Sequence, residues 1–201
     1  AVMSTDSSGN SDYSSSQGTS MASPAIAGNA LLLQQYYNSL NTSYMRAATL
    51  KGLILHTALE AGDDPGPDYM FGFGLINTEA AANLITAKAN QSAVIEEVNL
   101  NNNATYTKTI SVTAGKPLVV SISWTDPAYV SSNSGTIDPT TKYLVNDLDV
   151  RVTRNGVTYF PWTLNPAVVW QAAVRNADNS RDNYEKIEID APATGTYTIT
   201  V

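Results

Sequence analysis

The 201-residue sequence contains no cysteine, and only 14% of its residues are charged. Without thiols the chain can form neither disulfide bonds nor thiolate metal sites. No apolar run approaches the ~20 residues that a helix needs to cross a bilayer, so we expect no membrane span. The net charge of −7 argues against a nucleic-acid partner, because binding phosphates needs a basic surface. Abundant Ser, Thr, Asn and Tyr favour a β-rich extracellular protein.

One stretch, residues 18–24, changes from polar loop residues to small and apolar ones. This change predicts a helix over roughly residues 20–37, capped by Thr19 or Ser20, with Pro24 close enough to its start to be tolerated. A serine in the first turn lies at the positive end of the helix dipole. That position suits a nucleophile or the binding of an oxyanion.

Gly18-Thr19-Ser20-Met21-Ala22-Ser23-Pro24 resembles the signature around the nucleophilic serine of the subtilisin-like serine proteases. Tyr69-Met70-Phe71-Gly72-Phe73-Gly74-Leu75-Ile76-Asn77 is similar to the Gly-x-Gly-Leu-Ile-Asn segment that closes the same catalytic domain. The resemblance implies hydrolysis of peptide bonds in protein or peptide substrates. The resemblance also implies that Ser20 is the nucleophile and a backbone oxyanion donor. It implies a role in substrate binding for Gly18, Thr19 and Met21.

A serine nucleophile needs a base that accepts its proton, usually a histidine held by an aspartate. The family places both, and the oxyanion asparagine, before the serine. His56 is the only histidine and follows it, so we expect a structural role for His56, and Asp6 and Asp12 are poor candidates for the aspartate. We therefore expect an inactive piece of a longer protein, whose N-terminal catalytic part is a missing partner. Neither the chemistry nor the family requires a cofactor.

The composition changes near residue 90 and predicts two domains, residues 1–90 and 91–201. The fold class expected is an α/β fragment, the C-terminal helices of a subtilisin-like domain, followed by an all-β jelly-roll or β-sandwich domain. We predict a second helix, capped by Thr42 or Ser43, that ends at about residue 58. A third helix, with Asn77 as its N-cap, is predicted to end at about residue 89. Residues 69–76 are expected to be extended. Alternating apolar residues predict strands at residues 94–100, 105–112, 118–124, 144–153, 157–163, 185–189 and 196–201.

Three segments of the second domain, residues 124–127, 144–150 and 182–187, look like parts of the jelly-roll domain that follows some bacterial subtilases, similar in kind to the P domain of kexin-like proteases. Asp126, Asp147 and Asp149 could hold a structural Ca²⁺, since carboxylate clusters bind calcium. The alternative is that these aspartates hydrogen-bond turn amides. The same choice applies to the carboxylates of the loop at residues 61–68.

The sequence thus favours the C-terminal part of a secreted or cell-surface, bacterial, subtilisin-like endopeptidase. The competing hypothesis is a non-catalytic binding module whose β-sandwich recognises polysaccharide or a surface protein. Trp124, Trp162 and Trp170 keep it open, because exposed aromatic rings can stack on sugars. If all three were buried, the sugar-binding version would lose its main support. A third possibility, a degenerate protease scaffold, conflicts with the intact stretch at residues 18–24.

Overall fold

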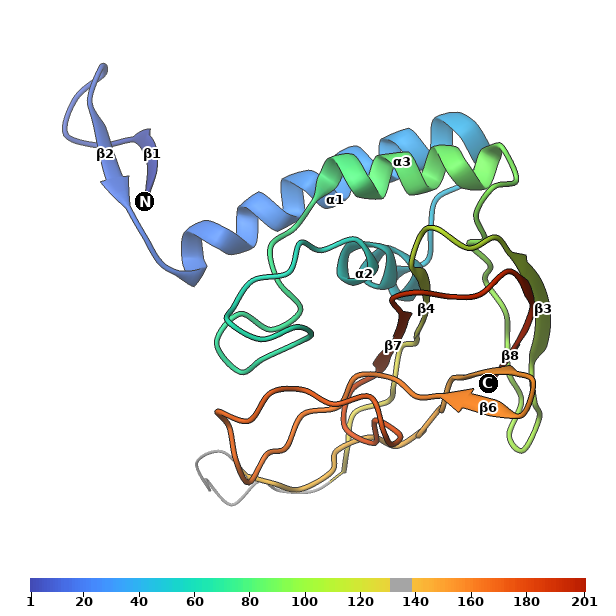
Figure 1. Cartoon of the computed structure of the whole chain (residues 1–201). Helices are drawn as coiled ribbons and strands as arrows, with labels where there is room; N and C mark the ends of the chain where they lie inside the picture. The colour runs from blue at the N-terminus through green and yellow to red at the C-terminus, as the bar shows by residue number, and fades with distance from the viewer. Residues whose placement is uncertain (131–138) are drawn as a thin grey trace.

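The computed structural model describes residues 1–130 and 139–201. Figure 1 shows the helices on one side, a β-rich region on the other, and an N-terminal hairpin that projects away from both. We call residues 1–90 the helical part and residues 91–201 the β part.

The helices are α1 (Thr19–Asn41), α2 (Ala47–His56) and α3 (Thr78–Ala89). The predicted start of α3 is confirmed, because the Asn77 side chain accepts a hydrogen bond from the Ala80 N–H at 2.9 Å and so satisfies one free donor of the first turn. The three helices share a small apolar core, made by Leu33, Tyr37, Met45, Leu53, Ala81 and Ile85.

The caps predicted for the first two helices are wrong. The residue before α1 is Gly18, whose φ of 132° suits glycine, and no side chain caps the helix. Thr42 ends α1 instead of beginning α2: its φ is 56°, and its N–H donates to the Asn38 carbonyl at 2.9 Å. The hydroxyls of Thr42 and Ser43 both donate back to the Asn41 carbonyl. Neither caps α2, because the residue at its N-cap position is Arg46.

The segment between α2 and α3 forms a tight turn where we expected an extended chain. Asp68 and Gly72 exchange two backbone hydrogen bonds of 3.0 Å, and Asp68 Oδ1 accepts from the N–H groups of Met70 at 2.7 Å and Phe71 at 2.5 Å. A side chain that binds backbone amides two and three residues later stabilises a turn locally. The sequence pattern of alternating apolar residues does not reveal this competition.

The first hairpin joins β1 (Val2–Thr5) to β2 (Tyr13–Ser16), and all eight residues are exposed. No strand was predicted at residues 13–16, which form β2. In the β part, a four-stranded antiparallel sheet has the order β3-β8-β5-β6, and a second sheet pairs β4 with β7. The strands are β3 (Thr107–Val112), β4 (Leu118–Ser123), β5 (Arg151–Arg154), β6 (Val157–Tyr159), β7 (Tyr184–Ile189) and β8 (Gly195–Thr200).

Six of the seven strands predicted for the β part correspond to these elements, although β5 and β6 are shorter than expected; residues 94–100 form no strand. The turn at Asn155 and Gly156 connects β5 to β6, with φ of 50° and 80°, as two-residue hairpins require. Side chains from both sheets meet in one apolar core, centred on Val150, Val152, Ile187, Ile189 and Tyr197. The predicted β-rich class is therefore confirmed, with antiparallel sheets throughout.

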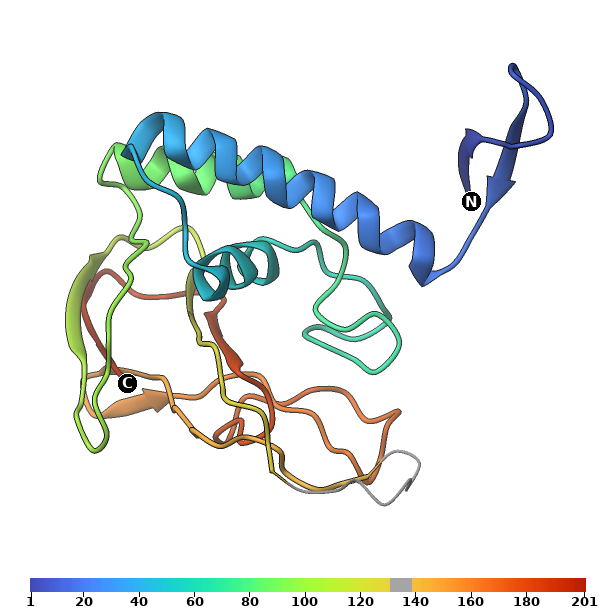
Figure 2. The same cartoon turned by 180° about the vertical axis from the view of Figure 1, so that it is seen from behind.

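The helical and β parts are in direct contact where α2 packs on β4 (Figure 2). A Cβ atom at Gly52 would lie only 2.8 Å from Ser123 Cβ, so glycine permits the close approach. The Lys51 ammonium donates to the Asn183 carbonyl at 3.0 Å and to its side-chain oxygen at 2.5 Å. The boundary at residue 90 therefore separates two regions of the sequence that pack together.

Candidate functional site

Ser20 is the second residue of α1 and is exposed. The N–H groups of Met21 and Ala22 both donate to the Gly18 carbonyl, at 3.1 and 3.2 Å. Within the described part of the chain, the N–H of Ser20 has no such acceptor, as expected for the first turn of a helix. A free N–H at the positive end of the helix dipole can stabilise a developing oxyanion.

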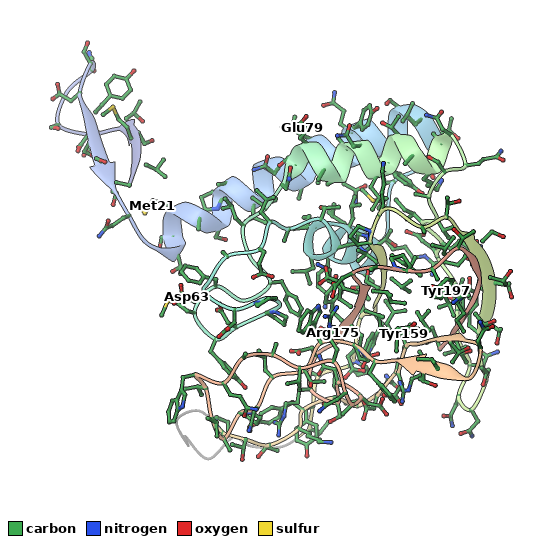
Figure 3. All side chains as sticks on the ribbon, in the orientation of Figure 1. Met21, Asp63, Glu79, Tyr159, Arg175 and Tyr197 are labelled. Atoms are coloured by element: carbon green, nitrogen blue, oxygen red, sulfur yellow. The ribbon has the colours of Figure 1, made fainter. Side chains whose placement is uncertain are left out.

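The three residues predicted to bind substrate flank this serine on the same turn. Gly18 and Thr19 are exposed and Met21 is half-buried; Figure 3 shows Met21 at the end of α1 that lies farthest from the β part. No imidazole or carboxylate among the described residues hydrogen-bonds to Ser20. The arrangement offers a nucleophile and one oxyanion donor, without a base.

His56 is the last residue of α2, which packs on β4 and lies away from the N-terminal end of α1 (Figure 1). Its Nδ1 is 2.8 Å from Ser121 Oγ. Burial lowers the pKa of His56 to about 4, and the charge of Lys186 adds a smaller lowering. The charge of Glu188 acts in the opposite direction. The imidazole is therefore neutral at pH 7 and occupied by a contact between the two parts of the chain.

Asp6 and Asp12 lie in the turn between β1 and β2. Asp6 accepts a hydrogen bond from the Ser8 N–H at 3.2 Å, and the Asp6 N–H donates to the Asp12 carbonyl at 2.9 Å. Hydrogen bonds from Ser14 and Ser8 lower the pKa of Asp6. Both aspartates thus belong to the hairpin, and neither contacts an imidazole among the described residues.

The structure does not gather Asp126, Asp147 and Asp149 into one cluster. The Asp126 carboxylate accepts from the Val145 N–H at 2.7 Å and from both the backbone and side-chain N–H groups of Asn146 at 2.9 Å. Among the described residues, no three His, Asp or Glu side chains are arranged to hold a metal ion. Calcium binding stays a prediction.

Asp149 and Asp178 both form ion pairs with the same guanidinium nitrogen, Arg151 Nη2. Burial and the nearby charge of Asp178 raise the pKa of Asp149, against the lowering effect of Arg151. The arginine therefore only partly compensates the two carboxylates.

The three tryptophans occupy different environments. Trp162 is buried, with 7% of its surface exposed, whereas Trp170 is 82% exposed. Trp124 is half-buried and its indole N–H donates to the Asn146 carbonyl at 3.1 Å. Only Trp170 presents most of its ring to solvent, so the sugar-binding hypothesis depends on that residue.

In the described part of the chain no helix combines the length and apolarity needed to cross a membrane.

Comparison with known proteins agrees with the motif around Ser20. Residues 1–74 match the model of the subtilase family. Over 70 residues the chain is 43% identical to subtilisin DY of Bacillus licheniformis, a match that covers 35% of this chain and 22% of that protein. The chain thus spans about a fifth of the length of this curated relative, and the whole β part lies outside the residues that match the family model. Residues 1–74 are therefore similar in sequence to a segment of the subtilisin-like proteins of the subtilase family.

Proposed function

We propose that the chain supplies the nucleophile-bearing part of a secreted, bacterial subtilisin-like serine endopeptidase. The observation that carries the proposal is Ser20 itself, exposed at the N-terminus of α1 inside a segment that matches the subtilase family. Its hydroxyl would attack the peptide carbonyl to form an acyl-enzyme, and its own N–H would donate to the oxyanion.

The base for this reaction would come from residues outside the chain. His56 is engaged with Ser121, and a hydroxyl without a base is a poor nucleophile at neutral pH. We therefore infer that the 201 residues alone have no triad catalysis.

The exposed surface of α1 supports the idea that further chain packs against it. Leu31 is 72% exposed and Leu32 is 59% exposed, whereas large apolar side chains of a stable helix are usually buried. We infer that the upstream part of the catalytic domain covers these residues in the complete protein.

The β part would act as a jelly-roll domain that stabilises the catalytic part, consistent with the contact of α2 with β4. A structural Ca²⁺ in the β part is a separate proposal, which equilibrium dialysis against calcium tests.

The alternative function is a binding module that recognises polysaccharide or a surface protein through Trp170, whose ring is exposed. Replacing Trp170 by alanine would abolish retention on a polysaccharide matrix if that alternative were correct, and would leave peptide hydrolysis by the longer protein unchanged if the protease proposal holds.

Labelling with a fluorophosphonate probe tests the protease proposal. We expect no labelling of the isolated 201 residues, and labelling at Ser20 in a longer protein that also contains the upstream residues. Ser20→Ala should abolish the label, whereas the matched variant Ser16→Ala, also at an exposed serine, should retain it. Rapid labelling of the isolated chain would contradict its inactivity, and labelling of the longer Ser20→Ala protein would contradict the assignment of the nucleophile.

A further inference from the structure

A cavity of about 360 Å³ lies at the contact between the helical and β parts. The segment after α2 forms one wall, and β7 with its neighbouring loops forms the other. The cavity is within the roughly 300–1,000 Å³ range of small-molecule sites, which often form where two parts of a protein meet. The lining residues that carry aromatic or charged groups are Glu60, Phe73, Trp162, Arg175, Lys186, Glu188 and Asp190.

Four of the five charged groups are already paired with each other. Lys186 Nζ lies 2.8 Å from Glu188 Oε1, and Arg175 Nη2 lies 2.8 Å from Asp190 Oδ2. Figure 3 shows Arg175 on the side of β7 that faces the segment of residues 57–76. The remaining charge in the lining is the carboxylate of Glu60, which has no ion-pair partner among the described residues.

The Glu60 carboxylate is nevertheless held in a fixed orientation. Its two oxygens accept hydrogen bonds from the N–H groups of Ala61 at 2.9 Å and Gly66 at 2.8 Å. Gly66 packs directly on Trp162, because a Cβ atom at this glycine would lie 2.7 Å from the indole ring. The carboxylate is thus attached through a rigid turn to the aromatic wall of the cavity.

We propose that this cavity binds a small organic cation, a primary ammonium group on a short apolar stem. The ammonium compensates the unpaired charge of Glu60, and the apolar stem packs against Phe73 in the lining. The ring of Trp162 is already covered by the Arg175 guanidinium, which lies 4.5 Å from the ring centroid. An anion would meet the carboxylates of Glu60, Glu188 and Asp190. The two cations of the lining, Lys186 and Arg175, are already paired with carboxylates. A neutral apolar molecule would displace water from the charged groups of the lining and would offer them no hydrogen bonds in its place. The proposal does not depend on the protease function.

The test is a titration of the ¹⁵N-labelled 201-residue chain with three ligands of equal stem: n-butylammonium, butyrate and butanol. The reporters are the Gly66 amide and the Trp162 indole N–H, which donate to Glu60 and Glu188 at 2.8 Å. We expect saturable shifts of both signals with n-butylammonium alone, weakened by added salt. The indole signals of Trp124 and Trp170 serve as internal controls.

Glu60→Gln keeps the size of the side chain and removes its charge, so we expect n-butylammonium to bind roughly fivefold more weakly, as for one solvent-accessible ion pair. The matched variant Glu79→Gln changes an exposed carboxylate on α3 and should bind as the wild type does. Equal shifts with butyrate or butanol, no saturable shift with n-butylammonium, or unchanged binding by Glu60→Gln would each overturn the proposal.

Discussion

A buried carboxylate makes the stability of the β part depend on pH. Glu185 is fully buried on the core side of β7, where its oxygens accept from the Val150 N–H at 2.6 Å and the Asn179 N–H at 3.0 Å. Burial raises its pKa from 4.5 to about 7, although the two hydrogen bonds oppose the rise; the charge of Asp149 adds to it. The folded protein therefore holds the proton on Glu185 more tightly than the unfolded chain does.

The sign and size of the effect follow from this difference. A raised pKa means that the stabilisation from protonated Glu185 is fully present below pH 4.5 and is lost as the pH rises through about 7. Because each pKa unit corresponds to about 1.4 kcal/mol, the whole loss amounts to about 3 kcal/mol, of which about 2.5 kcal/mol falls between pH 5 and pH 8.

Glu185→Gln removes the titrating group and should remove this part of the pH dependence. We would measure the free energy of unfolding in urea from pH 5 to pH 8, following tryptophan fluorescence, for the wild type, Glu185→Gln and the exposed control Glu79→Gln. The wild type and the control should lose about 2.5 kcal/mol more than Glu185→Gln over this range. Parallel pH profiles for the wild type and Glu185→Gln would refute the reasoning, as would a Glu185 carboxyl ¹³C signal that titrates near 4.5.

Three further substitutions test local features of the helical part. Gly74→Ala should destabilise the protein by about 3 kcal/mol or more, because φ of Gly74 is 103° and a Cβ there would lie 2.0 Å from the Leu59 carbonyl oxygen. Gly72→Ala should cost only about 1–2 kcal/mol, because φ of Gly72 is 61° and a Cβ there would meet no atom within 4 Å. Equal costs in thermal unfolding would contradict the steric argument. Asn77→Ala removes the cap of α3 and should cost about 1 kcal/mol in urea unfolding; an unchanged midpoint would show that solvent replaces the cap.

The elements that sequence predicts well are those whose signals are local. α3 begins after the asparagine that its sequence indicates. The alternating residues Ile187 and Ile189 of β7 and Tyr197 and Ile199 of β8 all pack in the core of the β part. The hairpin strand β2 was missed because Tyr-Ser-Ser-Ser has no apolar alternation, and all of its residues are exposed. The turn at Asp68 was missed because a side-chain carboxylate, not an apolar pattern, determines it.

The candidate sites differ in the same way. Ser20 lies in a contiguous motif, so its role as nucleophile can be predicted from seven adjacent residues. The cavity is built from two regions of the chain, and its distinctive feature is the contact of Gly66 with Trp162. Neither residue is unusual in its own sequence context, and Glu60 is a solitary carboxylate in a turn-rich segment. These residues come together only in the folded chain, where the segment after α2 packs on the β part.

The start of α1 and the core strands of the β part should differ in how well they protect their amides from hydrogen exchange. In the β part, core residues such as Val152 and Ile187 have no exposed surface, whereas α1 begins outside the helical core, and its first buried residue is Leu33. Local opening is easiest where few apolar contacts are made. We expect amides of residues 19–28 to exchange within seconds to minutes, and those of β7 and β8 to persist far longer. Strong protection of residues 19–28 would mean that the exposed start of α1 is covered in solution, and a concentration series would then distinguish self-association from packing within one chain. Fast exchange in both regions would contradict the complete core assigned to the β part.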